Sequence, residues 1–203
     1  MKGLFIDCGG HIGESVEYFK SSEIYKKYRW DIHTFEPHPD LIEQMVCKDD
    51  GDVTIHQKAV WVNDEELDFF PSTKKGSYLN KNGVLWGSGT LMRTKNSGCL
   101  DFDNPIKVQA VNLSQFIFEN SKDFEFTILK MDVEGAEYEI LKHLIKTGAI
   151  KCISYLLVEF HHNKMSGKIL DHFCLLLRLK LLGIPMIVEK LDHKSGDWFS
   201  EIK

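Results

Sequence analysis

The feature that most constrains the fold is a short apolar run near the amino terminus that ends in an acid and a glycine-rich turn. Residues 3–6 predict a buried strand, and Asp7, Gly9 and Gly13 follow it directly, before a helical pattern. A strand, a glycine-rich turn and a helix in this order are typical of the nucleotide-type cofactor site of α/β proteins. The alternative is an ordinary tight turn, in which the glycines serve only the backbone geometry.

The acids of this turn indicate which cofactor fits. Glu14 falls in the first turn of the predicted helix, where a dinucleotide would place its pyrophosphate. Two negative charges about 5 Å apart repel each other by roughly 1 kcal/mol in water and by more in a cleft. The spacing D-x-G-x-x-x-G also differs from the dinucleotide pattern G-x-G-x-x-G. S-adenosylmethionine carries positive charge and no phosphate, so we expect it to bind at Asp7, Gly9, Gly13, Glu14 and Ser15.

A second acid closes the next predicted strand, residues 31–35. Glu36 at that position is placed to accept hydrogen bonds from the ribose hydroxyls of a cofactor. Pro37 ends the strand, and a helix is expected over residues 41–46. The alternative role for Glu36 is that of an acid at the amino terminus of this helix.

Alternating strand and helix patterns predict an α/β fold with a mostly parallel sheet and helices on both faces. Further strands are expected at residues 53–60, 67–70, 106–111, 126–131 and 152–158. The last elements, residues 184–190 and 197–202, predict an antiparallel hairpin around residues 194–196. Residues 71–105 lack periodicity, and we interpret them as a mobile loop on the acceptor side of the site.

Two later strands deliver chemically active side chains. Asp132 follows the strand at residues 126–131, and Glu159 and His161 follow the strand at 152–158. Ligands of open α/β sheets bind beyond the carboxyl ends of the strands, so these groups are expected to meet there. Asp132 and Glu159 could share a divalent cation such as Mg²⁺ or Mn²⁺, with His161 as base or third ligand. Alternatively, His161 acts as a base that titrates near pH 7, or the two acids cap the turns that follow them.

Two further acids flank Gly135. Glu137 is expected in the first turn of the next helix, where the helix dipole favours a negative charge. Glu134 is a second candidate for a side chain that faces the cleft.

Composition excludes several classes of protein. The 203 residues suit a single domain, and a net charge of −5 argues against a nucleic-acid-binding surface. Five cysteines without a C-x-x-C pair predict a reducing, cytoplasmic environment and neither a disulfide framework nor a zinc site. The apolar stretch at residues 175–188 is interrupted by charged residues, Gly183 and Pro185, so no membrane span is expected. The chain enters a strand almost at once, which indicates that no signal peptide precedes it.

Taken in order, these segments resemble the FkbM-type methyltransferases, a class I S-adenosylmethionine-dependent family. The matching segments are Asp7-x-Gly9-x-x-x-Gly13, Phe35-Glu36-Pro37, Lys58-Ala59-Val60, Lys130-Met131-Asp132-Val133-Glu134-Gly135-Ala136-Glu137 and Val158-Glu159. The resemblance implies a Rossmann-like sheet of seven strands, and it adds Pro37 and Ala59 to the expected cofactor site. It also implies O-methylation of a sugar hydroxyl on a glycan or a natural product. Similar domains are fused to glycosyltransferases, so residues 1–203 could be a domain excised from such a protein.

Three functions from different classes therefore remain. The first is a sugar O-methyltransferase with a carbohydrate acceptor and no nucleic-acid or membrane partner. The second is a nicotinamide-dependent oxidoreductase, which Glu14 and the glycine spacing disfavour. The third is a methyltransferase fold that serves as a non-catalytic binding module, against which the intact acids at four strand ends argue.

Overall fold

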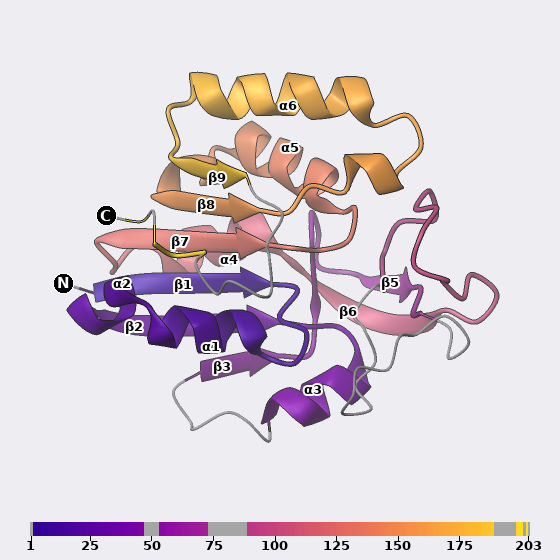
Figure 1. The fold of residues 1–203 in the computed structure, drawn as a ribbon, viewed down its shortest axis with the longest axis horizontal. Helices are drawn as coiled ribbons and strands as arrows, with labels where there is room; N and C mark the ends of the chain where they lie inside the picture. The colour runs from indigo at the N-terminus through magenta and orange to yellow at the C-terminus, as the bar shows by residue number, and fades with distance from the viewer. Residues whose placement is uncertain (1, 47–52, 73–88, 189–197, 201, 203) are drawn as a thin grey trace.

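The protein is built around a parallel sheet of six strands (Figure 1). The computed structural model describes residues 2–46, 53–72, 89–188, 198–200 and 202. The strands are β1 (Lys2–Cys8), β2 (Arg29–Phe35), β3 (Val53–His56), β7 (Phe126–Met131), β8 (Tyr155–Val158) and β9 (Met186–Val188). Their order is β3-β2-β1-β7-β8-β9, and every neighbouring pair is parallel. This is a doubly wound order, in which the direction of strand addition reverses between β1 and β7. The described sheet thus has six strands and not the seven that were expected.

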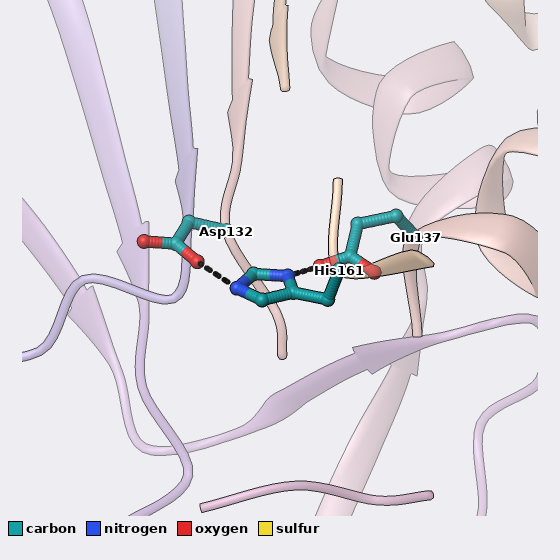
Figure 2. A group of neighbouring side chains, drawn as sticks. All are labelled: Asp132, Glu137 and His161. Carbon is teal, nitrogen blue, oxygen red and sulfur yellow. Dashed lines mark hydrogen bonds and ion pairs between the residues drawn. The ribbon is translucent and has the colours of Figure 1, made fainter. Parts of the chain in front are cut away.

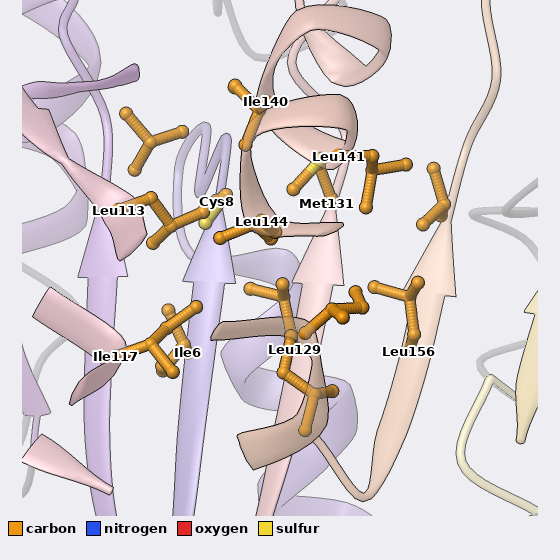
Figure 3. Packing of buried hydrophobic residues seen from close by; sticks show 14 of the residues in the cluster. Ile6, Cys8, Leu113, Ile117, Leu129, Met131, Ile140, Leu141, Leu144 and Leu156 are labelled. Atoms are coloured by element: carbon orange, nitrogen blue, oxygen red, sulfur yellow. The ribbon is translucent and has the colours of Figure 1, made fainter. Parts of the chain in front are cut away.

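Helices cover both faces of this sheet, as the sequence predicts (Figure 1). The helices are α1 (Glu14–Ser21), α2 (Glu23–Lys27), α3 (Pro39–Val46), α4 (Leu113–Asn120), α5 (Glu137–Thr147) and α6 (Ile169–Leu181), with short 3₁₀ helices at Ala149–Cys152 and His162–Lys164. Side chains of a strand alternate between faces. Ile6 of β1 accordingly packs under α4 and α5 (Figure 3), and Leu4 belongs to the same core cluster, whereas Phe5 packs against α1. Both faces of β1 are therefore buried, as is usual in parallel sheets.

A second, three-stranded sheet lies beyond the carboxyl ends of the main strands (Figure 1). It contains β4 (Ala59–Trp61), β6 (Ile106–Asn112) and β5 (Glu66–Phe69) in the order β4-β6-β5, with β4 parallel and β5 antiparallel to β6. The expectation of one strand over residues 53–60 is wrong. A tight turn, closed by the Lys58 N–H to the carbonyl of His56 at 2.8 Å, ends β3 and sends the chain into the small sheet.

The expected carboxyl-terminal hairpin is also wrong where the structure describes it. β9 runs parallel to β8, and residues 198–200 form a turn; the expected hairpin turn at residues 194–196 lies outside the described residues. Trp198 and Phe199 are buried on the α1 face of the sheet, and the Phe199 ring lies 5.0 Å from that of Phe19. Burial of these aromatic side chains outweighs strand pairing for this segment.

Helix α6 buries only one side. Leu175 and Leu179 join the core, whereas Ile169, Phe173 and Leu177 on the outer side are 59–64% exposed. No helix in the described part of the chain is long and apolar enough to cross a membrane.

Candidate active site

The loop after β1 binds the ends of three strands together. The N–H groups of Gly9 and Gly10 both donate to the carbonyl of Phe35 at the end of β2, at 3.0 Å. Gly9 has φ +81°, and a Cβ at this position would lie 1.9 Å from the carbonyl oxygen of Asp132 after β7. Only glycine permits this approach and this backbone conformation. Gly13 ends the loop with φ +93° as the N-cap of α1.

Asp7 and Ser15 face the interior beneath this loop. The Oδ2 of Asp7 accepts hydrogen bonds from the hydroxyls of Ser15 and Thr34, and its Oδ1 lies 3.1 Å from the Nζ of Lys130. The same ammonium donates to the carbonyl of Gly9 at 2.8 Å. Asp7 and Ser15 are both buried. In this structure they shape the loop from below, and their contact with a cofactor stays a prediction.

Glu36 connects the end of β2 to the glycine-rich loop. Its Oε2 accepts the N–H of His11 at 3.0 Å, and its Oε1 accepts the N–H of His38 at 2.9 Å. Each oxygen keeps a second lone pair for a ribose hydroxyl. Burial raises the pKa of Glu36 to about 7, although both N–H groups favour the ionised form.

The other expected cofactor residues lie at separate places. Glu14 is the first residue of α1, partly exposed, with its Oε2 3.6 Å from the Nδ1 of His11. Pro37 is half-buried directly after Glu36. Ala59 is buried in the core of the small sheet, where it pairs with Ala110 of β6.

The three expected catalytic residues do come together. The Nε2 of His161 lies 3.7 Å from Asp132 Oδ1 and 3.7 Å from Glu159 Oε1. Glu134 is closer still, with its Oε2 at 3.3 Å from the same nitrogen. On the opposite side of the ring, the Nδ1 of His161 lies 2.7 Å from Oε1 of Glu137 (Figure 2). Four carboxylates thus surround one imidazole at the carboxyl edge of the sheet.

Glu137 stabilises the protonated form of His161. The Oε1 of Glu137 also accepts the N–H groups of Gly135 at 3.1 Å and Val133 at 3.3 Å. Burial lowers the pKa of His161, but the hydrogen bond and charge of Glu137, with the charges of Glu134 and Asp132, raise it to about 9. His161 is therefore a cation at neutral pH, and a base role requires that it first lose its proton.

The remaining carboxylates of this cluster differ in their charge state. Burial and the neighbouring Asp132 raise the pKa of Glu159 to about 7. Burial acts in the same direction on Glu134, but His161 and Lys95 outweigh it and lower the pKa of Glu134 below its usual value. Within the described chain, Asp132, Glu137 and His161 each offer an atom within 4.8 Å of the others, which is a spacing that suits a metal ion.

The sequence did not predict the contacts of two members of this site. Glu137 lies in the first turn of α5 as expected, but it is fully buried, because its carboxylate turns back onto the preceding N–H groups. Lys95 belongs to the long loop, and its Nζ lies 2.8 Å from Oε2 of Glu134. The spacing of Glu137 from Gly135 is a signal that could have been used, whereas nothing in the sequence distinguishes Lys95 from other loop lysines.

The described part of the long loop is attached to the site. The Thr90 hydroxyl donates to the carbonyl of Glu134 at 2.7 Å, and the N–H of Asn96 donates to the carbonyl of Lys164 at 3.0 Å. Glu134 itself has φ +52°. Residues 73–88 of the expected mobile loop lie outside the described residues.

The fold and this edge define a doubly wound α/β domain with a glycine-rich loop after β1 and an acidic cluster around His161. The model of the methyltransferase FkbM domain matches residues 7–181, so the chain belongs to the FkbM methyltransferase family. Membership implies, at a general level, a cofactor of the S-adenosylmethionine type.

Further comparisons add little to this assignment. The crystal structure of a methyltransferase FkbM from Methylobacillus flagellatus KT is similar over 90% of this chain, with 18% identity and a TM-score of 0.46. The match spans 37% of the length of that protein's chain. No curated protein matches significantly.

Proposed function

We propose that the protein is an S-adenosylmethionine-dependent O-methyltransferase that acts on a sugar hydroxyl of a glycan or a glycosylated small molecule. The observation that carries the proposal is the convergence of Asp132, Glu159 and His161 beside the glycine-rich loop. Methyl transfer to a hydroxyl needs a donor site and a proton acceptor next to each other, and this edge offers both. A carbohydrate acceptor and a link to glycosyltransferases are parts of the proposal that the family resemblance supplies.

The residues present fit the cofactor. Glu36 has free lone pairs at the end of β2, where ribose hydroxyls are expected. The loop carries no lysine or arginine for a phosphate, and Glu14 at the start of α1 favours a positively charged ligand. S-adenosylmethionine, when bound, supplies an electrophilic methyl group.

The protein's share of the reaction is positioning and proton removal. As the new O–C bond forms, the hydroxyl proton passes to a carboxylate, for which Glu159 with a pKa of about 7 is well matched. Asp132 lies on the adjacent strand end and orients the acceptor by accepting a hydrogen bond from a neighbouring hydroxyl of the sugar. His161, as a cation between these acids, keeps them oriented and donates from Nε2.

The cofactor assignment is tested by calorimetry with S-adenosylhomocysteine and NAD side by side. We expect micromolar binding of S-adenosylhomocysteine and far weaker binding of NAD. Tight NAD binding would instead support the nicotinamide-dependent oxidoreductase.

The catalytic assignment is tested by methyl transfer from labelled S-adenosylmethionine to a panel of glycosides. Asp132→Asn and His161→Ala should each lower turnover at least ~100-fold, whereas the exposed Glu43→Gln on α3 should not. Cofactor binding without transfer to any acceptor would favour the non-catalytic module.

A further inference from the structure

We infer that this carboxyl edge contains a divalent-cation site in which Glu137 is a positioning residue. Glu137 holds His161 through Nδ1, so that Nε2 faces the carboxylate oxygens of Asp132, Glu134 and Glu159. The inference rests on the proposed function, and it adds a third carboxylate, Glu134, and an orienting acid, Glu137, to the expected set of Asp132, Glu159 and His161.

The hydrogen bonds of Glu137 fix which nitrogen of His161 is available. The Oε1 of Glu137 accepts two backbone N–H groups, so it also acts as an acceptor towards the ring. Nδ1 therefore carries a proton, and Nε2 is the nitrogen that can bind a cation. This is the carboxylate–histidine–metal arrangement, in which the carboxylate orients the ligand and does not touch the ion.

The spacing around Nε2 suits a single ion. The three carboxylate oxygens lie 3.3, 3.7 and 3.7 Å from this nitrogen. Ligands that sit about 2.1–2.3 Å from one ion are separated from each other by about 3.0–3.7 Å in octahedral or tetrahedral sites. Each of the three oxygens therefore lies at the spacing from Nε2 that two ligands of one ion have.

The charges around the site favour a divalent ion. Four carboxylates surround His161, and two lysines lie beside one of them. The ammonium groups of Lys95 and Lys164 lie 2.8 and 3.5 Å from Oε2 of Glu134. A divalent cation at Nε2 adds positive charge where the carboxylates outnumber the ammonium groups. In addition, Oε2 of Glu137 is buried without a hydrogen-bond partner in the described part of the chain. A buried carboxylate oxygen in that state is stabilised by positive charge close by.

The ligand set distinguishes between cations. Mg²⁺ prefers oxygen ligands alone, whereas an imidazole together with carboxylates suits Mn²⁺ and later metals of the first row. We therefore expect Mn²⁺ to bind more tightly than Mg²⁺. A cation there would polarise the acceptor hydroxyl and ease the loss of its proton.

The experiment titrates Mn²⁺ alone into the protein saturated with S-adenosylhomocysteine, with free Mn²⁺ followed by electron paramagnetic resonance. Glu137→Gln should weaken Mn²⁺ binding 10–100-fold, which is the usual effect of losing an orienting carboxylate. Glu43→Gln is the matched control and should bind Mn²⁺ as the wild type does. Retained affinity for S-adenosylhomocysteine shows that each variant is folded.

A second measurement needs no change at Glu137. Pulsed paramagnetic resonance of wild-type protein labelled with ¹⁵N-histidine should show coupling of Mn²⁺ to one imidazole nitrogen, and His161→Gln should abolish it. Absence of Mn²⁺ binding at millimolar concentration, binding without nitrogen coupling, or unchanged affinity in Glu137→Gln would each overturn the inference. If the protein transfers methyl groups in excess chelator, the cation site is contradicted but the proposed function is not. If the protein does not bind S-adenosylhomocysteine, the proposed function itself is contradicted.

Discussion

The Nδ1 of His161 lies 2.7 Å from Oε1 of Glu137, and the two residues are 1% and 0% exposed. The contact joins the first residue of α5 to the segment that follows β8. It therefore links the segment after β7 to the segment after β8 through one buried charge pair. The strength of this pair depends on whether His161 is protonated.

The first prediction concerns the pH dependence of stability. The pKa of His161 is raised to about 9, so the folded protein holds this proton more tightly than the unfolded chain does. The resulting stabilisation is fully present below about pH 6.5 and is lost as the pH rises through about 9. We expect the free energy of unfolding in urea, measured with chelator present, to fall between pH 7 and 9.5 by at most ~3 kcal/mol. His161→Gln should show a flatter profile, and an equal fall in both proteins would contradict the assignment.

A second prediction links Glu36 to cofactor affinity. Because the pKa of Glu36 is raised to about 7, its carboxyl is largely neutral at pH 6 and largely ionised at pH 8. An ionised carboxylate is the better acceptor for ribose hydroxyls. Calorimetry should show about tenfold tighter binding of S-adenosylhomocysteine at pH 8 than at pH 6.

Glu36→Gln supplies the comparison for this pH effect. The variant should bind the cofactor more weakly by about 1–3 kcal/mol at pH 8, with no corresponding pH dependence. A pH-dependent gain of similar size in the variant would show that another group is responsible.

The third prediction compares two glycines that share a left-handed backbone. Gly9→Ala should be strongly destabilising, because the new Cβ would lie 1.9 Å from the carbonyl oxygen of Asp132. Gly148 has φ +86°, and no atom lies within 4 Å of where a Cβ would be. Gly148→Ala should therefore lower the free energy of unfolding by only about 1–2 kcal/mol, because of the backbone conformation alone. Thermal denaturation of both variants separates the steric effect from the conformational one, and equal losses would argue against a close contact.

A fourth prediction concerns the attachment of the long loop. Lys95 is buried against Glu134, so Lys95→Met should destabilise this contact by about 3 kcal/mol and expose residues 89–105 to protease. Lys107→Met removes an exposed ion pair with Asp68 and should leave the cleavage pattern unchanged. Identical digestion of the two variants would show that Lys95 does not hold the loop.

The main sheet and its active edge could largely be predicted from the sequence. The buried strands β1 and β7 are largely apolar runs, and an acid stands at or beside the carboxyl end of three strands, namely Asp7 in β1, Glu36 after β2 and Asp132 after β7. The carboxyl ends of parallel strands meet at one edge, so the convergence of Asp132, Glu159 and His161 followed from the strand assignments alone.

What could not be predicted depends on contacts between distant segments. Residues 53–55 and 59–60 both carry apolar side chains of a strand, and nothing in the polar residues between them shows that the two halves belong to different sheets. The adjacent carboxyl-terminal aromatics Trp198 and Phe199 were expected in a strand but are buried against α1. The burial of Glu137 depends on the position of His161, 24 residues later in the chain, which local patterns do not encode.

The close approach of Gly9 to Asp132 has a mechanical consequence. The N–H of Asp132 donates to the carbonyl of Cys8 at 3.0 Å, and Lys130 donates to the carbonyl of Gly9, so the loop and the acid are fastened on both sides of the contact. These contacts fix the loop relative to Asp132. In the proposed reaction, folding thus sets the distance between the loop that would hold the methyl donor and the acid beside the acceptor.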